Sequence, residues 1–304
     1  MLLSNKDFKI IKTFNMQKLM KLVENKTNSN SLVVQKIDES CIQKNDRGII
    51  SKMFFPEIFD YSINLKVLFY EKYIDFFLVN SHFFANILIK SGISKKKIIL
   101  IKDFAPEPDI FSQVDTSILG DYFLYHYSFE NIGFLEEFLK KCPKTYKMIL
   151  FSENKIDKKI IDLMKKREFE NAFYLENASM QEISPLISMS RFVFLDTKIL
   201  AQNILNFYSY KKAIVAPYSQ FNAEYISYAS SGLMYKNLED SFKNIDYLLK
   251  NYDFCQSLGH FSYNLAKNCF NQKNYELKLF NILMSQSSNI KTPETLGIGN
   301  FSFS

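Results

Sequence analysis

The sequence predicts an α/β protein whose second half is a doubly wound parallel sheet. Two observations lead to this fold class. From about Ser112 onward, short apolar runs alternate with helical patterns, and the clearest example is residues 191–235. There the strand patterns RFVFLD and KAIVAP flank one helical pattern, and a loop then opens a short helix that closes on Gly232. Two buried strands separated by one helix are typical of parallel strands joined by a crossover.

The rest of the second half repeats this alternation. Strand patterns at 121–127, 147–153 and 172–177 are each followed by a helical pattern, at 132–141, 157–167 and 179–190. The last helix carries Ser179 as its N-cap and Glu182 three residues later, which is the signature of a capping box. Three further helical segments follow, at 238–252, 254–270 and 274–286. Five or six such strand–helix units in a row imply a doubly wound parallel sheet.

The first half is less regular. It contains strand patterns at 32–38, 76–81 and 96–104, a long helical pattern at 55–73, and a helix at 82–93 that ends at Gly92. Residues 105–117 hold two prolines and no periodicity, which is typical of a linker between domains. We therefore expect an N-terminal domain at 1–112, a C-terminal domain at 113–285 and a loose tail at 286–304.

Composition and charge exclude several classes of protein. The net charge is +6, and residues 1–112 contribute +5 of it. This excess favours attraction to anionic surfaces, but no basic, aromatic-interleaved motif predicts a nucleic-acid partner. The four cysteines fit no zinc or redox spacing. The chain shows no signal-peptide pattern and no apolar run of membrane-spanning length, so we expect a cytoplasmic protein. With three histidines and eight glycines, it forms no recognisable Ser/His/Asp triad, P-loop or dinucleotide fingerprint.

Several residues recur at the spacing of a known family. In that family a strand, a serine and a helix are followed by the approach to the second domain. The segment 76–111 has the same order, and Ser81, Gly92, Ile93 and Phe111 stand in matching places. In the second half, the matching positions are Lys212, Glu224 and Gly232. Over roughly residues 75–285 the chain thus resembles the GT-B-fold glycosyltransferases of the group 1 (family 4) type. The resemblance implies two Rossmann-like domains facing a cleft, with the final helix crossing back to the first domain.

The chain departs from that family at the donor site. Counting back from Lys212, the second of the family's two glutamates falls on Asn206 and the first on Lys198. In the family the second glutamate grips the nucleotide ribose and the first lies against the sugar. The Arg and Lys that meet the donor diphosphate are missing after the strand at 121–127. A donor site in this chain would therefore differ from the usual one.

Five residues are candidates for donor binding. Asn206 can hydrogen-bond a ribose, and Lys198 can supply a positive charge at the end of a strand. Ser128 and Asn131 open the helix at 132–141, whose backbone N–H groups favour a phosphate. Glu224 occupies the family's acidic position and is expected to face a helix N-terminus. Each has an alternative interpretation: a polar residue at the cleft rim for Asn206, a solvated lysine for Lys198, helix capping for Ser128 and Asn131, and service to the helix dipole for Glu224.

Two residues are candidates for catalysis. Asp38 ends the strand pattern at 32–38, and His126 ends the one at 121–127, where a histidine can act as an acid or base. A capping or loop role for Asp38 and a packed or surface position for His126 are the alternatives.

The resemblance implies a retaining, hexosyltransferase-like enzyme that needs no metal or other cofactor. We expect it to move a sugar from a nucleotide-sugar donor to a saccharide or lipid-linked acceptor, in cell-surface polysaccharide assembly. The charged front part favours peripheral association with anionic membranes. The alternative is a non-catalytic GT-B-like protein that binds or stabilises a partner glycosyltransferase.

Overall fold

The computed structural model describes residues 8–11, 32–37, 42–44, 61–63, 71–107, 121–127, 131–169, 171–196, 201–226 and 230–287. The chain divides into two compact units. Unit 1 comprises Met1–Asp103 together with Lys273–Ser304, and unit 2 comprises Phe104–Gln272. Both are α/β, as the sequence predicts.

These limits differ from the predicted domain boundaries at 112 and 285. The chain enters unit 2 directly after Asp103, because the residues that follow form hydrogen bonds with other residues of unit 2. The Ala105 N–H donates to the Phe270 carbonyl at 2.7 Å, and the Ser209 hydroxyl donates to the Pro106 carbonyl at 2.5 Å. The final helix lies in unit 1, as the family resemblance implies, although the predicted C-terminal domain at 113–285 included it. Most of the predicted linker lies outside the described residues.

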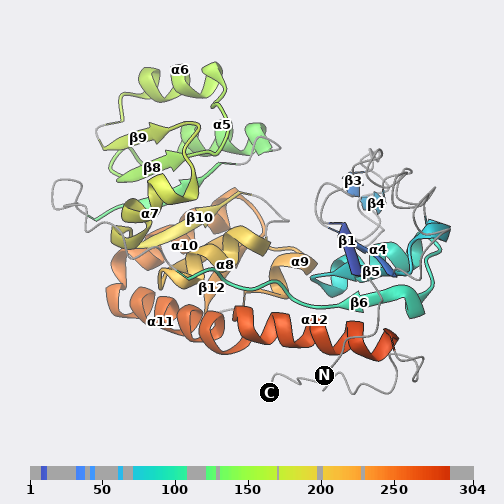
Figure 1. Ribbon diagram of the computed structural model, residues 1–304. Coiled ribbons are helices and arrows are strands. Elements are labelled where there is room, and N and C mark those ends of the chain that lie inside the picture. The colour runs from blue at the N-terminus through green and yellow to red at the C-terminus, as the bar shows by residue number, and fades with distance from the viewer. Residues whose placement is uncertain are drawn as a thin grey trace. The chain divides into compact units, whose positions relative to one another are not determined.

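Unit 2 is built on a six-stranded, fully parallel sheet in the order β12-β11-β10-β7-β8-β9 (Figure 1). Its central strands are buried on both faces and are accordingly rich in apolar residues, which is characteristic of parallel sheets. The strands are β7 (Phe123–His126), β8 (Met148–Phe151), β9 (Ala172–Leu175), β10 (Phe192–Leu195), β11 (Ala213–Pro217) and β12 (Gly232–Tyr235).

Helices cover both faces of this sheet, as in a doubly wound fold. The Ser179–Glu182 capping box predicted at the start of α7 is confirmed. The helices are α5 (Ile132–Lys141), α6 (Lys158–Arg167), α7 (Met180–Met189), α8 (Ala201–Ser209), α9 (Gln220–Ala223), α10 (Leu238–Lys250) and α11 (Tyr252–Cys269).

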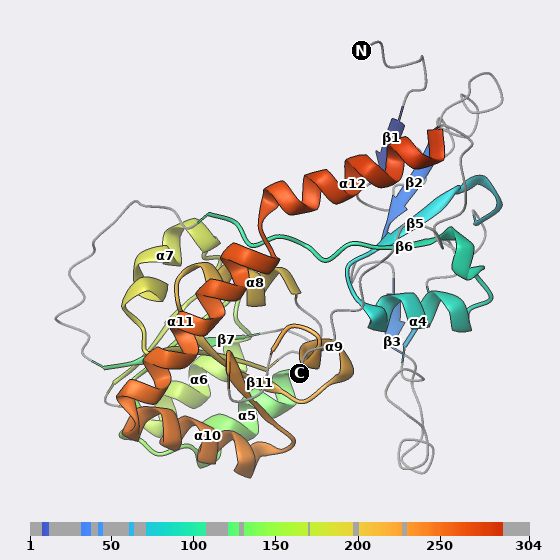
Figure 2. The same cartoon turned by 90° about the horizontal axis from the view of Figure 1, so that it is seen from below.

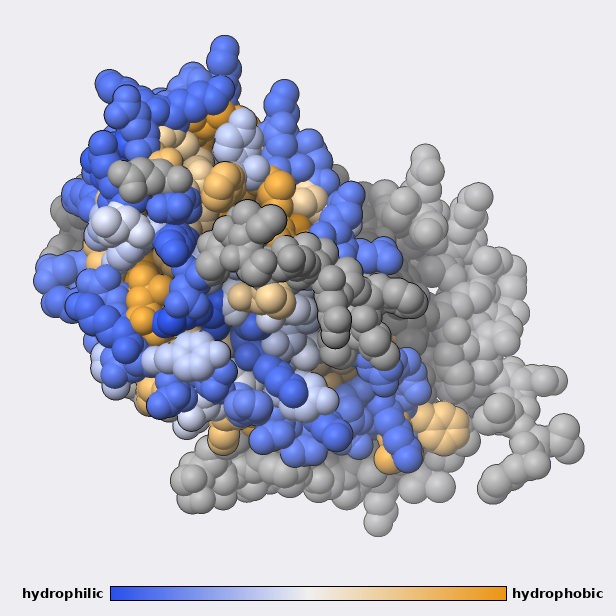
Figure 3. All heavy atoms as spheres, turned by 90° about the vertical axis from the view of Figure 1, so that its left-hand side faces the viewer, coloured by the Kyte–Doolittle hydropathy of each residue, from blue (hydrophilic) through white to orange (hydrophobic). Residues whose placement is uncertain are grey.

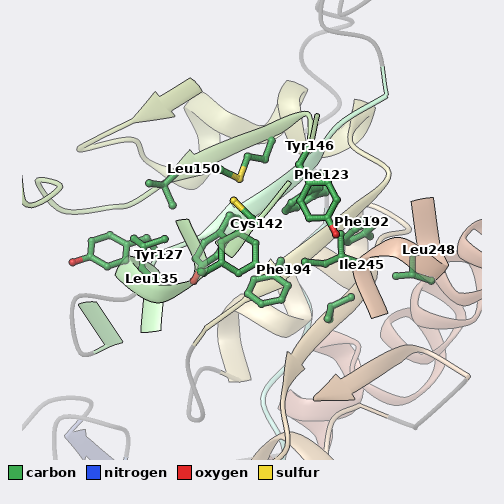
Figure 4. Packing of buried hydrophobic residues seen from close by; sticks show 14 of the residues in the cluster. Phe123, Tyr127, Leu135, Cys142, Tyr146, Leu150, Phe192, Phe194, Ile245 and Leu248 are labelled. Carbon is green, nitrogen blue, oxygen red and sulfur yellow. The ribbon is translucent and has the colours of Figure 1, made fainter. Parts of the chain in front are cut away.

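One hydrophobic cluster of the core of unit 2 lies between the sheet and helices α5, α6, α10 and α11. It is strongly aromatic: the rings of Phe123 and Phe192 stack with their centroids 5.1 Å apart, and Phe194 stacks on Tyr235 at 5.2 Å. Figure 4 shows the rings of Phe123, Phe192 and Phe194 with Ile245 and Leu248 of α10. The abundance of phenylalanine in the sequence is therefore used, at least here, to fill a core.

Unit 1 contains a parallel sheet in the order β1-β2-β5-β6 and a separate antiparallel pair, β3 with β4. The final helix, α12, lies beside this sheet (Figure 2). Its Tyr275, Leu279 and Ile282 pack against a buried cluster that includes Val34 and Leu78 of the sheet. This confirms the expectation that the last helix returns to the first domain. The elements are β1 (Phe8–Ile11), β2 (Leu32–Lys36), β3 (Ile42–Lys44), β4 (Tyr61–Ile63), β5 (Phe76–Val79), β6 (Ile98–Leu100), α4 (His82–Lys90), α12 (Gln272–Ser287) and 3-10 turns at Glu71–Tyr73 and Lys95–Lys97.

Two predicted elements are wrong. The long helix predicted at 55–73 is interrupted by β4, which pairs with β3. Its apolar spacing suits a helix, but tertiary pairing overrides that local pattern. The short helix predicted to close on Gly232 ends earlier, at Ala223, and Gly232 instead begins β12.

Gly232 and Gly259 both lie where another backbone approaches closely. A Cβ on Gly232 would collide with the carbonyl of Ile214, its register partner in β11. A Cβ on Gly259 of α11 would collide with the carbonyl of Lys211, which turns the chain into β11 with φ of 58°. In both cases the missing side chain permits the contact.

On the face of the molecule shown in Figure 3, most of the coloured residues are hydrophilic and apolar residues gather in a few places. At the sheet edge formed by β9, Phe173, Tyr174 and Leu175 are exposed. Among the described helices, none combines the length and apolar character required to cross a bilayer.

Candidate functional site

The strand order of unit 2 reverses between β7 and β10. From β7 the chain proceeds to β8 and β9 on one side, and then returns to place β10 on the other side of β7. In open parallel sheets, ligands bind outside the carboxyl ends of the strands at such a reversal. Leu195 pairs with His126 here, so Asp196 and Tyr127 follow the two strands side by side. We call this region the β7/β10 edge, comprising Tyr125–Tyr127, Asn131, Leu195–Asp196 and Tyr235.

Asp196 is the charged residue at the centre of the β7/β10 edge. It is only 2% exposed. The Tyr125 hydroxyl donates to its Oδ2 at 3.4 Å, and the Asn131 side-chain amide donates to its backbone carbonyl. Asp196 therefore links the end of β10 to β7 and to the start of α5.

Two further tyrosines complete this environment. The Tyr235 hydroxyl donates to the Leu195 carbonyl at 2.9 Å, and Tyr127 is buried on the same side of the sheet. Burial, and then the neighbouring Asp196 carboxylate, raise the pKa values of Tyr125 and Tyr235 well above the usual range. These hydroxyls are consequently protonated and act as neutral hydrogen-bond donors near a carboxylate.

His126 lies on the opposite face of the sheet, within the core. It is 4% exposed and its ring lies 4.8 Å from that of Phe151 and 6.3 Å from that of Phe207. Desolvation lowers its pKa to about 4, so the imidazole is neutral near pH 7. This position favours the packed interpretation of His126 over a role as an acid–base group.

The structure places two candidates near the reversal. Asn131 is the N-cap residue of α5, yet its side chain makes no cap hydrogen bond and instead holds the end of β10. Asn206 is half-buried in α8, next to Phe207. The Phe207 ring lies 6.3 Å from that of His126, so α8 packs against the end of β7.

Glu224, expected to face a helix N-terminus, lies at the C-terminal end of α9. Ser219 caps the N-terminal end by accepting from the Asn222 N–H at 2.9 Å, and Glu224 is the C-cap residue. A carboxylate at a helix C-terminus gains nothing from the helix dipole. The remaining candidates, Asp38, Ser128 and Lys198, lie outside the described residues.

Sequence reasoning missed Asp196 and its tyrosine partners. The available signal was the position of Asp196, since it closes the strand pattern RFVFLD immediately before the candidate Lys198. Tyr125 and Tyr235 carried no such signal, because an apolar strand position and a buried tyrosine donor are indistinguishable in a hydrophobic pattern.

Unit 1 has its own polar group at the carboxyl ends of its strands. Asp103, following β6, accepts from Lys36 of β2 at 2.6 Å and from Asn80 after β5 at 2.7 Å. Asp103 and Asn80 are buried. This arrangement joins three strand ends by charge-assisted bonds and is well suited to hold the sheet together.

Three solved structures illustrate what the chain resembles. HepE from Anabaena, in complex with UDP and glucose, is 13% identical, with a TM-score of 0.69 over 91% of this chain and 78% of that one. A glycosyltransferase from Rickettsia africae is 13% identical, with a TM-score of 0.67 over 93% and 77%. Sucrose-phosphate synthase from Thermosynechococcus elongatus is 11% identical, with a TM-score of 0.67 over 92% and 74%.

By sequence, no protein-family model and no curated protein matches the chain. The structural likeness nevertheless spans nine-tenths of it and includes both units. The resemblance drawn from the sequence is thus confirmed at the level of architecture: the chain has the fold of the GT-B glycosyltransferases.

Proposed function

We propose that this protein is a glycosyltransferase that takes a nucleotide-sugar donor and transfers its sugar to a saccharide acceptor. The observation that carries the proposal is the strand reversal at the β7/β10 edge in a chain with the GT-B fold. Such a reversal is where open parallel sheets bind nucleotides. Among the similar structures, HepE is described with UDP, with UDP-glucose, and with UDP and glucose.

In this proposal the donor lies outside the carboxyl ends of β7 and β10. Its diphosphate meets the start of α5, where Ser128 and Asn131 precede unpaired helix N–H groups, and Lys198 supplies a positive charge. Asn206 hydrogen-bonds the ribose. Asp196 is buried, so it acts as a positioning residue that fixes the end of β10 and, through Asn131, the start of α5.

The finer features of the proposal come from the family resemblance. They are retention of configuration, a hexosyl donor, no requirement for metal, and a role in cell-surface polysaccharide assembly. Asp38 remains the candidate that places the acceptor hydroxyl. A transfer assay with and without EDTA, followed by NMR of the product anomer, tests the metal and the stereochemistry directly.

Thermal unfolding in the presence of UDP, GDP, ADP, TDP and CMP is the first test. A nucleotide present at a concentration of a hundred times its Kd stabilises the native state by about 2.7 kcal/mol, which produces a clear rise in Tm. Release of the matching free nucleotide from its sugar conjugate then tests turnover. If none of the nucleotides raises Tm at millimolar concentration, the donor site does not exist as proposed.

Lys198→Glu tests the arrangement of the donor. It restores the residue type of the family at this position, yet we expect it to weaken nucleotide binding about tenfold to a hundredfold, because it removes a charge-assisted bond worth about 1.5–3 kcal/mol. Lys211→Glu, at an exposed lysine on the turn after α8, is a matched control. Equal or tighter binding by Lys198→Glu would contradict the assigned role.

A second function is favoured by one specific observation. Both family glutamates and the diphosphate-binding cations are replaced in this chain. A non-catalytic GT-B-like protein that stabilises a partner glycosyltransferase would tolerate these losses. Nucleotide binding without any release of sugar, measured with the full donor panel, would favour this second function.

We also propose a cytoplasmic protein that associates peripherally with anionic membranes through its front part, which carries +5 of the +6 net charge. Each basic side chain near such a surface contributes about 1 kcal/mol, and salt screens the attraction. Co-sedimentation should therefore exceed background with vesicles containing phosphatidylserine at low salt, and disappear at high salt. Equal recovery with neutral vesicles would exclude this attraction.

A further inference from the structure

An open cavity of about 500 Å³ lies at the carboxyl ends of β11 and β12 in unit 2, beside the backbone of Tyr235. Its lining comes from β12, from the residues that directly follow β11 and β12, and from the first two turns of α10: Tyr218, Met234, Lys236, Asp240, Lys243 and Asn244. None of these residues belongs to the proposed donor site. We propose that this cavity is a carbohydrate-binding site, separate from the site of transfer.

The apolar part of the cavity is the ring of Tyr218. This side chain is 50% exposed, although large aromatic side chains are usually well buried. Its backbone is fixed, because its N–H donates to the Tyr235 carbonyl at 2.7 Å. An aromatic ring held in this way offers a flat surface to the C–H face of a sugar, at a low cost in conformational entropy.

The polar part of the cavity contains both donors and acceptors. The Lys236 ammonium lies 6.0 Å from the centre of the Tyr218 ring. The Asp240 carboxylate accepts a hydrogen bond from the backbone N–H of Lys236 at 3.4 Å. Asn244 donates to the Met234 carbonyl at 3.3 Å. Amide, carboxylate and ammonium groups around one ring can together meet the alternating donors and acceptors of sugar hydroxyls.

The charges decide between a sugar and a phosphate. Two lysines line the cavity, but Asp240 lies among them, and Lys243 is paired with Glu239 at 2.8 Å. The cavity and its immediate surroundings are therefore close to neutral. A phosphate or nucleotide diphosphate would be opposed by Asp240, whereas a neutral polyhydroxylated ligand uses both signs of charge without a net penalty.

Binding is tested with the purified full chain on a broad printed glycan array and, at millimolar concentration, by ligand-observed NMR with maltotetraose, cellotetraose, chitotetraose and mannotetraose. The site predicts saturation transfer to at least one glycan. Tyr218→Ala should reduce the affinity of the protein for that glycan about tenfold or more, and Tyr218→Phe, which keeps the ring, should retain the affinity. Tyr247→Ala is the matched control, since Tyr247 is 48% exposed on α10 but does not line the cavity.

The inference does not depend on the proposed transferase function, and the same preparations separate the two. If nucleotides stabilise the Tyr218→Ala variant as much as the wild type while glycan binding is lost, the result supports both the donor site and the carbohydrate site. Glycan binding without any nucleotide effect supports the cavity alone. Absence of binding on the array and by NMR, or binding that Tyr218→Ala leaves unchanged, overturns the carbohydrate site.

Discussion

The two parallel sheets differ in the side chains that join the carboxyl ends of their strands. In unit 1 the ends of β2, β5 and β6 are joined through Lys36, Asn80 and Asp103, an ion pair with an additional amide donor. In unit 2 the ends of β7 and β10 are joined through Asp196, whose carboxylate accepts a hydrogen bond from the Tyr125 hydroxyl at 3.4 Å. Both arrangements use a buried aspartate, and in the first its carboxylate is paired with the Lys36 ammonium at 2.6 Å.

Topology explains which of the two edges suits a ligand. The described strands of unit 1 follow one another in chain order across the sheet, whereas those of unit 2 reverse at β7. At a reversal the connections leave in opposite directions, and a crevice opens between them. The described carboxyl ends of unit 1 are therefore joined mainly for stability, whereas the strand reversal in unit 2 is the kind of place where a nucleotide can bind.

The largest effect is expected from Asp103→Ala. It leaves Lys36 and Asn80 without their shared acceptor, and breaking a buried ion pair costs about 3–5 kcal/mol. Because Lys36 is partly exposed, we expect about 3 kcal/mol, measured as lost hydrogen-exchange protection of β2, β5 and β6. The control is Glu71→Ala, which breaks the half-exposed pair with Lys97 and should cost at most about 1 kcal/mol. Equal costs for the two variants would remove the distinction drawn for unit 1.

A loss of stability of similar size is expected at His126 when the pH is lowered. The pKa of His126 is about 4 in the folded state, where the ring is buried, and 6.5 when the ring is exposed in the unfolded chain. Between these values the unfolded chain binds the extra proton, so the contribution of this group to stability falls as the pH drops from 6.5 to 4. At 1.36 kcal/mol for each pKa unit, the loss is about 3 kcal/mol.

Urea unfolding at several pH values measures this loss. His126→Phe should show a shallower decline between pH 6.5 and 4 than the wild type, while His260→Gln, at an exposed histidine, should follow the wild type. A decline that is unchanged in His126→Phe would mean that His126 is accessible to protons in the native state, and would revive its candidacy as an acid–base group.

Tyr125→Phe is expected to have a smaller effect. It removes the hydroxyl that donates to Asp196 but keeps the ring that packs on Phe138 and Phe194. A hydrogen bond of this kind contributes about 1 kcal/mol, and somewhat more when its acceptor is charged. Thermal unfolding gives the cost. If Asp196 positions the donor site, nucleotide affinity should fall as well; an affinity equal to that of the wild type would confine Asp196 to a structural role.

The smallest effect is expected from Gly133→Ala in the first turn of α5. No described atom lies within 4 Å of a Cβ built there, so alanine should stabilise the free protein by about 0.5 kcal/mol through helix propensity. If the donor diphosphate approaches this turn, the added methyl group should nevertheless weaken nucleotide binding. A gain in Tm with undiminished nucleotide affinity would place the diphosphate elsewhere.

Much of the fold could be predicted because its signals are local. The strand and helix patterns of unit 2 recur in the structure, and the Ser179–Glu182 capping box lies where its sequence places it. The errors arose where distant contacts decide the outcome. Tyr61–Ile63 is a strand because Ile42–Lys44 pairs with it, and no local pattern records that partner.

The site was less predictable for the same reason. The sequence identified the strand ends, and so Asn131 and His126, but it could not show which face of the sheet each side chain occupies. His126 faces Phe151 and Phe207 in the core, and Asn131 reaches across to β10. Asp196 gains its importance from Tyr125, 71 positions away, which is a contact that only the folded sheet creates.

Gly232 and Gly259 have a consequence for the mutational tolerance of this chain. It has only eight glycines in 304 residues, and at these two positions the carbonyls of Ile214 and Lys211 occupy the space of any Cβ. Every other amino acid has a Cβ, so no coding change at either codon is neutral. In a complete scan of single substitutions, these positions should tolerate fewer residues than the exposed Tyr218, however conservative the replacement.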